Sequence, residues 1–100
     1  MLEQADMKLL MIIVESVHKV ELEVLLNKHD VVGYTEIPQV HGSGKSGQRM
    51  GSRAFPKTSS VIFTVIPADV LKELVADIER YCEACMKQMK MIVWSVEQVI

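Results

Sequence analysis

The strongest constraint on the fold is a pattern that occurs twice: a short apolar segment rich in β-branched residues, a turn and an amphipathic helical period. The two copies are "IIVESVHKVELEVLL" and "FTVIPADVLKELVADI". A further strand pattern follows each copy, at residues 31–40 and 90–100. Two β-α-β units with right-handed crossovers predict an α+β fold of the ferredoxin-like type, βαββαβ, with a four-stranded antiparallel sheet and both helices on one face.

Single residues indicate where these elements begin, end or bend. Ser16 is expected to cap the first helix by accepting a hydrogen bond from a free backbone N–H. Val17, Val20 and Val24 are expected to form the apolar stripe of that helix, widened by three leucines. Pro38 cannot donate a ladder hydrogen bond, which predicts that the second strand lies at a sheet edge or breaks there.

Three of the four predicted strands are apolar on both faces, although two helices can cover only one side of a sheet. In the last strand, Ile92, Trp94 and Val96 point one way, while Met91 and Val93 point the other. Hydrophobic residues make up 49% of the chain. An exposed apolar face promotes aggregation, so this pattern predicts that the sheet packs against further copies of the chain.

Charge and residue order argue against several functional classes. The formal net charge is −2, from 11 basic and 13 acidic side chains, whereas nucleic-acid binding favours a basic excess. Glu3 and Asp6 precede the first apolar run, where a secretory signal would carry basic residues, and the run is too short to span a bilayer. No triad-like order or carboxylate pair indicates catalysis. We therefore expect a cytoplasmic protein that is not an enzyme.

The segment "HGSGKSGQRMGSR" interrupts the apolar pattern and predicts a loop over about residues 41–58. Its glycines allow backbone N–H groups to converge on an anion. Lys45, Arg49, Arg53 and Lys57 add positive charge suited to phosphate or carboxylate. We expect the loop to be mobile alone and to be ordered by an anionic ligand or an acidic protein surface. Arg49 and Arg53 are not expected to contribute to the core.

Cys82 and Cys85 form a C-x-x-C pair near the predicted end of the second helix. The helix dipole at that end disfavours a reactive thiolate. As metal ligands the pair would need further partners, such as His41 at the root of the loop. The simpler interpretation is that the cysteines are small apolar residues closing a helix face. His41, Cys82 and Cys85 are therefore candidate metal ligands, and the question of metal binding stays open.

Several stretches resemble the PII signalling family. "MKLLMIIV" is similar to the family's first strand, "YTEI" with "GSGK" to its T-E-V strand and the G-F-G-R at the base of its T-loop, and "KMIVWSVEQV" to its closing segment. A length of 100 residues predicts a single domain over residues 1–100. The resemblance implies a trimer with clefts between subunits. The ligand-binding residues that it implies are Thr35, Gly42, Gly44, Lys45 and Lys90. The residues that it places in the target-binding loop are Arg49, Arg53 and Lys57.

The chain also departs from the family pattern. No tyrosine lies between Gly42 and Ser60, where the family carries a modification site, and Ser46 replaces a glutamine that helps to hold metal and 2-oxoglutarate. The phosphate-binding B-loop reads "CEACMKQMK" and contains no glycine, and the chain ends at Ile100 without the arginines that grip ATP. We therefore expect ATP to bind weakly or not at all, and ADP or AMP to be affected less.

The resemblance implies a trimeric regulatory protein that requires no cofactor. It would bind a small anionic ligand, with ADP or AMP as candidates, and would signal through its loop to a protein target such as a membrane transporter or an enzyme. The alternative is metal binding or metal tolerance, as in the CutA-like and efflux-associated PII-like trimers that share this fold.

Overall fold

The computed structural model describes residues 6–31, 33–44, 47–53, 56–82, 87 and 89–100. Among these residues, no helix is long and apolar enough to cross a membrane. The elements in chain order are β1 (Met7–Glu15), the 3-10 turn η1 (Ser16–His18), α1 (Lys19–Lys28), β2 (Thr35–Val40), β3 (Gly42–Gly44), β4 (Gly47–Arg49), β5 (Ser59–Pro67), α2 (Ala68–Tyr81) and β6 (Met89–Val96).

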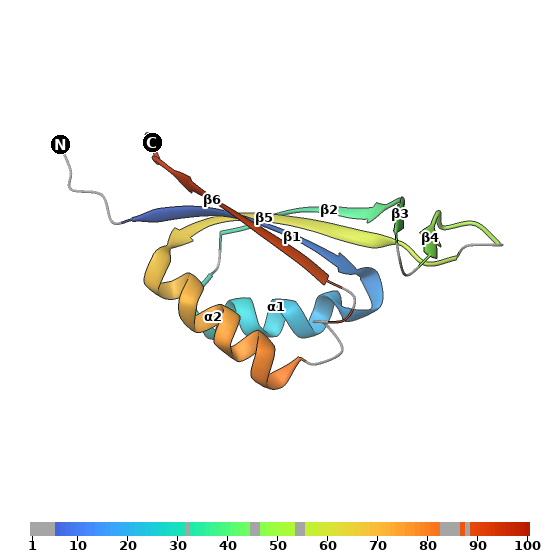
Figure 1. Ribbon diagram of the computed structural model, residues 1–100, viewed down its shortest axis with the longest axis horizontal. Coiled ribbons are helices and arrows are strands. Elements are labelled where there is room, and N and C mark those ends of the chain that lie inside the picture. Colours follow the sequence, from blue (N-terminus) through green and yellow to red (C-terminus); the bar gives the residue numbers. More distant parts are fainter. Residues whose placement is uncertain (1–5, 32, 45–46, 54–55, 83–86, 88) are drawn as a thin grey trace.

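Four strands form one antiparallel sheet in the order β2-β5-β1-β6. Both helices lie on the same face of this sheet, and the β3–β4 hairpin projects from one end of it (Figure 1). The predicted ferredoxin-like arrangement is therefore confirmed. Because β2 and β6 are the outer strands, they supply the two edges of the sheet.

The hydrophobic core lies between the helices and the sheet. On β1 every second side chain is fully buried, namely Leu10, Ile12 and Val14, as expected for a strand whose alternate residues point to one covered face. Leu22 and Leu26 of α1 and Leu74 and Ile78 of α2 pack against them. Burying each such side chain contributes roughly 1.5–3 kcal/mol, so this layer holds the elements together.

The opposite face of the sheet is apolar and uncovered. The register places Leu9 beside Trp94 and Met11 beside Ile92, which confirms the predicted orientation of alternate residues in the last strand. Trp94 is 46% exposed and Ile92 is 41% exposed, although both are large apolar side chains. The same face continues across β5 and β2 through Val65, Phe63, Val61 and Ile37.

The N-terminal end of α1 differs from the prediction in two ways. Ser16 does not cap the helix, because η1 precedes α1 and the Ser16 hydroxyl lies 2.8 Å from that of Thr58 instead. Val17, Val20 and Val24 face solvent with exposures of 61–67%. The buried face is formed by Leu22, Leu25 and Leu26. Both stripes fit a helical period, and only tertiary packing decides which of them faces the core.

Strand β2 is shorter than predicted, and it is irregular where Pro38 was expected to weaken it. Its pairing with β5 shifts register between Ile37 and Val40, and Gln39 has a φ of 55°. Three residues of β2 here oppose two of β5, which is a β-bulge, and an extra residue of this kind bends a strand locally and increases its twist. The prediction that Pro38 lies on an edge strand is confirmed.

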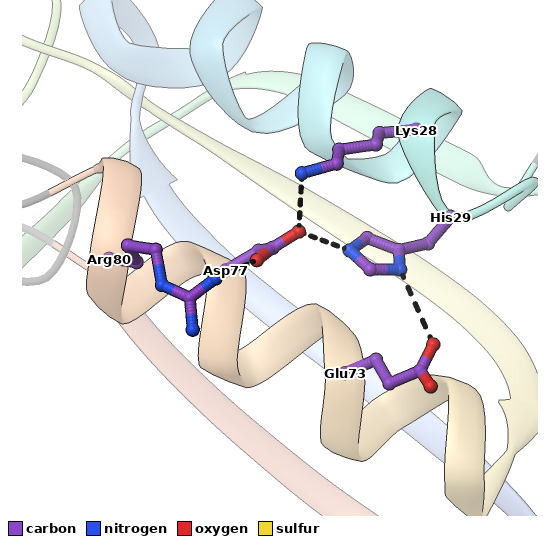
Figure 2. Close-up of polar contacts among 5 residues, drawn as sticks. All are labelled: Lys28, His29, Glu73, Asp77 and Arg80. Atoms are coloured by element: carbon purple, nitrogen blue, oxygen red, sulfur yellow. Dashed lines mark hydrogen bonds and ion pairs between the residues drawn. The ribbon is translucent and has the colours of Figure 1, made fainter.

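A polar cluster joins the two helices (Figure 2). Asp77 of α2 has a side chain only 11% exposed, and its Oδ2 lies 2.9 Å from Lys28 Nζ and 2.8 Å from His29 Nε2. Arg80 Nη1 lies 3.6 Å from Asp77 Oδ1, and Glu73 lies 4.0 Å from the other nitrogen of His29. The hydrogen bond from Lys28, followed by that from His29, lowers the pKa of Asp77 below 3.8. A largely buried carboxylate is tolerated here because cations surround it.

Candidate functional site

A groove of about 560 Å³ opens where the chain enters β2. Thr35 lies on the open face of the sheet, since it pairs with Phe63 and Phe63 pairs with Met11. Hydroxyl, amide and apolar groups therefore meet in one cavity, which is typical of a small-molecule site. The residues lining it are Leu9, Gly33, Tyr34, Thr35, Phe63, Thr64, Val65 and Gln98.

The wall of this groove is fixed to the rest of the fold by side-chain hydrogen bonds. The Thr64 hydroxyl donates to the Gly33 carbonyl at 2.6 Å, and the Tyr34 hydroxyl donates to a Glu23 carboxylate oxygen at 2.7 Å. The bond to Glu23 is the main reason why the pKa of Tyr34 is raised above 10.0. A segment held from both β5 and α1 presents Thr35 to the groove with little freedom.

One residue further along β2, Glu36 pairs with Lys19 of α1 at 3.0 Å. The Glu36 carboxylate at this distance raises the pKa of Lys19 above 10.5. The pair adds a second link between the β2 edge and α1. It also neutralises the one carboxylate in β2, which leaves less negative charge beside the groove to repel an anionic ligand.

Lys90 is exposed and lies at the other edge of the sheet. It pairs with Ile13, whose row continues through Val61 to Ile37 on β2. Lys90 therefore shares the open face with Thr35 but is separated from β2 by two strands. Adjacent strands are about 4.8 Å apart, so the two edges are roughly 14 Å apart. One subunit alone does not bring Thr35 and Lys90 to the same ligand.

The loop root forms a short hairpin that was not predicted. Strands β3 and β4 pair with Gly42 opposite Arg49 and Gly44 opposite Gly47. Downstream, Gly51 has a φ of 64°, and a side chain there would approach Thr58 at 3.1 Å, so glycine suits this position on both counts. Lys45, another predicted ligand contact, lies outside the described residues.

The loop's basic residues have different environments. Arg53 is exposed, as a target-binding residue would be. Arg49 is directed inward, with a side chain only 11% exposed, and its Nη2 lies 3.2 Å from Oε2 of Glu15. Lys57 Nζ lies 3.6 Å from the other oxygen of Glu15 but remains largely exposed. Arg49 is not among the residues of the hydrophobic core, but it neutralises a buried carboxylate, a contact that the sequence did not predict.

The candidate metal ligands do not form a site in the described part of the chain. There, no group of three or more histidine, cysteine or acidic side chains could hold a metal ion. His41 is exposed at the loop root. Cys82 is buried at the end of α2, and it is disulfide-bonded, which differs from the unlinked apolar side chain that was expected there. Cys85 lies outside the described residues.

Comparison with known proteins identifies the family. A model of the family described as Nitrogen regulatory protein P-II matches residues 7–100. The chain belongs to this family. Family membership identifies a signalling protein rather than an enzyme. A search of curated proteins finds no match.

Solved structures of P-II-like proteins share the fold at low sequence identity. CPII from Thiomonas intermedia K12, bound to ADP, AMP and bicarbonate, is 23% identical with a TM-score of 0.75, over 95% of this chain and 97% of CPII. A CPII structure bound to ADP and bicarbonate is 26% identical with a TM-score of 0.74, over 90% of this chain and 85% of that one. Arabidopsis thaliana PII bound to citrate is 17% identical with a TM-score of 0.67, over 94% and 80%.

The sequence did not reveal several residues of this site. Tyr34 and Gln98 line the groove; both stand in stretches that carry the family resemblance, "YTEI" and "KMIVWSVEQV", but neither was expected to contact a ligand. Glu15 is the clearest omission, since it ends an apolar strand and is buried. A carboxylate at the end of an apolar strand, in a chain with a basic loop, was the sequence signal that could have indicated an ion pair between the two. Its partners only become apparent once β1 and the loop are placed side by side.

Proposed function

We propose that this P-II family member is a homotrimeric regulator that binds a small anionic ligand between subunits and signals through its loop. The observation that carries the proposal is the separation of Thr35 and Lys90 on opposite edges of a sheet whose open face is apolar and uncovered. Within one subunit, neither the Thr35 edge nor the Lys90 edge forms a complete ligand site. The uncovered face provides a surface on which subunits can assemble.

A closed ring of subunits would bring the β2 edge of one subunit and the β6 edge of its neighbour into one site. In a cyclic assembly with unlike surfaces in contact, each interface joins one edge of a subunit to the other edge of its neighbour. Packing of the open faces would bring the groove beside β2 of one subunit toward β6 of the next. Thr35 would then contact the ligand from one side, and Lys90 would supply positive charge from the other.

The proposed ligand is an adenine nucleotide, with ADP or AMP preferred over ATP. CPII, which shares the fold, has been solved with ADP and AMP. In this chain the B-loop lacks glycine, so its backbone N–H groups are less able to wrap around a chain of phosphates. A nucleotide with fewer phosphates requires fewer such contacts. Gly42 and Gly44, in β3 at the loop root, and Lys45 remain proposed contacts for the ligand's charged end.

Calorimetric titration of the assembled protein with AMP, ADP and ATP tests this proposal. Thr35→Val removes a hydroxyl at nearly constant volume, and Lys90→Gln removes a charge. We expect each variant to weaken nucleotide binding by about tenfold, since a hydrogen bond or charge contact contributes roughly 1.4 kcal/mol or more. Lys72→Gln, an exposed lysine on α2, is the matched control and should bind like wild type.

The same titration distinguishes the nucleotide proposal from its alternative. Divalent metals such as Zn²⁺ and Cu²⁺ are added in parallel at matched ionic strength. Saturable binding of ADP or AMP without tight metal binding supports the proposal. Tight metal binding with no response to any nucleotide contradicts it and supports the CutA-like or efflux-associated alternative.

The loop is proposed to contact a protein target, such as a membrane transporter or an enzyme. Arg53 and Lys57 offer exposed positive charge for this purpose. Arg49 is also proposed to contribute, but its guanidinium must first leave Glu15. Target binding and the loop conformation are therefore coupled through this residue.

A further inference from the structure

A carboxylate at the end of β1 is buried under the root of the loop. The side chain of Glu15 is only 5% exposed. A buried charge without a partner is costly, so a residue of this kind persists only when cations or hydrogen-bond donors meet it. Among the residues that the structure describes, the cations that meet Glu15 are Arg49 at 3.2 Å and Lys57 at 3.6 Å, and they come from the loop between β2 and β5.

The geometry brings the β3–β4 hairpin and the C-terminal end of the loop together at this point. The Ser16 amide donates to the Thr58 carbonyl at 3.0 Å, and the two hydroxyls of these residues are 2.8 Å apart. These contacts fix the end of the loop beside Glu15. Arg49, at the end of β4, reaches the same carboxylate from the hairpin. The hairpin is therefore held in place through the Glu15 side chain, whereas the end of the loop at Thr58 is held by Ser16 and does not need Glu15.

We propose that Glu15 is an internal latch that occupies the loop's own oxyanion-binding groups. Arginine binds a carboxylate or phosphate through a fork of N–H donors, and Arg49 here uses one of these on a carboxylate of the chain itself. An external oxyanion that reaches Arg49 and Lys57 competes with Glu15 for the same donors. This inference deepens the proposed function, because it assumes that the loop is the signalling element.

The latch also predicts how the loop root discriminates between ligands of different charge. Arg49 and Lys57 carry two positive charges, of which Glu15 cancels one, so a net charge of +1 remains for a ligand. With its own carboxylate present, the loop root repels a second carboxylate close to Arg49. A multiply charged ligand therefore binds this root less readily than it would bind the two cations alone.

Hydrogen exchange of the hairpin in the free protein tests the latch. Glu15→Gln keeps the shape of the side chain and removes the charge, while Arg49→Gln breaks the same pair from the loop side, away from the core. In both variants we expect amides of residues 41–44 and 47–53 to exchange at least about tenfold faster than in wild type, the change produced by roughly 1.4 kcal/mol. Arg53→Gln, an exposed arginine in the same loop, is the matched control and should leave exchange unchanged.

Formate, the smallest carboxylate, then tests whether an external oxyanion can replace Glu15. At constant ionic strength with chloride as the reference, formate should restore protection of the hairpin in Glu15→Ala, because the truncated side chain leaves room for an external carboxylate beside Arg49. It should not do so in Arg49→Gln. Wild-type exchange in folded Glu15→Gln or Arg49→Gln, or no response of Glu15→Ala to saturating formate, overturns the proposal.

These measurements are independent of nucleotide binding. If Glu15→Gln fails to fold, Arg49→Gln still decides whether the ion pair docks the hairpin, and wild-type exchange in it rejects the latch. Conversely, a hairpin that responds as expected in a protein that binds no nucleotide supports the latch and rejects the proposed ligand. The two proposals can therefore fail separately.

Discussion

At the scale of single residues, Gln39 has the most strained backbone conformation of β2. Its φ of 55° places a side chain in the left-handed region, which costs roughly 1–2 kcal/mol for an L-residue. We expect Gln39→Val to lower the free energy of unfolding by about 1–2 kcal/mol, because a β-branched residue tolerates this region poorly. Gln39→Gly should be neutral or slightly stabilising. Urea unfolding at fixed pH measures both changes.

Val40 supplies the control for this prediction. It is the next residue of β2 and has no positive φ, so Val40→Gly should destabilise the protein through added freedom of the unfolded chain. If glycine at residue 39 destabilised the fold as much as glycine at residue 40, the bulge would not be strained. The left-handed conformation would then be an ordinary feature of the turn into the loop.

A second prediction at this scale concerns Tyr34, whose hydroxyl donates to Glu23. Tyr34→Phe should lower the free energy of unfolding at neutral pH by about 1–2 kcal/mol, because a hydrogen bond to a charged acceptor is lost. The pKa of Tyr34 is raised, so the bond's contribution is complete below pH 10.0 and is lost as pH rises through the raised value. Wild type and variant should therefore converge in strongly alkaline urea titrations. A difference that persists there would indicate lost packing instead.

At the scale of elements, Asp77 is the link between α1 and α2 that responds to pH. Asp77→Asn should destabilise the fold at neutral pH, because Lys28 and His29 lose a charged acceptor. The pKa of Asp77 is lowered, so its contribution is complete above pH 3.8 and is lost as pH falls through the lowered value. Thermal unfolding of wild type and variant should differ near neutrality and converge in acid. Glu79→Gln, exposed on the same helix, should show no such difference at either pH.

Most elements of this fold could be predicted from the sequence, because their apolar periods are strong. The segment "SSVIFTVI" lies within β5, and the alternation of Ile92 and Trp94 is as predicted. Prediction failed where the local sequence pattern fitted two structures equally well or gave no pattern at all. The valines of α1 fit a helical stripe as well as the leucines do, and the β3–β4 hairpin has no apolar alternation to indicate strands. Thr35 could be placed by resemblance, but Glu15 depends on a contact between distant segments.

At the scale of the whole molecule, the open face of the sheet should control assembly. Trp94→Lys places a charge in the centre of this face, where it would be buried without a partner in the proposed trimer. We expect light scattering to show a trimer for wild type and a monomer for the variant. Val24→Lys, on the exposed outer stripe of α1, should remain trimeric. A trimeric Trp94→Lys variant would place the interface elsewhere.

The separation of Thr35 and Lys90 on opposite edges has a consequence for mixtures of defective chains. If each cleft takes Thr35 from one subunit and Lys90 from its neighbour, Thr35→Val and Lys90→Gln chains can complement one another. Random co-assembly of equal amounts would give roughly a quarter of clefts with both native residues, the product of two independent halves. A site contained within one chain would recover nothing. Under that arrangement, the binding capacity of such hybrids would show that two subunits build each site, and a defect in one copy of the gene would be partly corrected by a different defect in another.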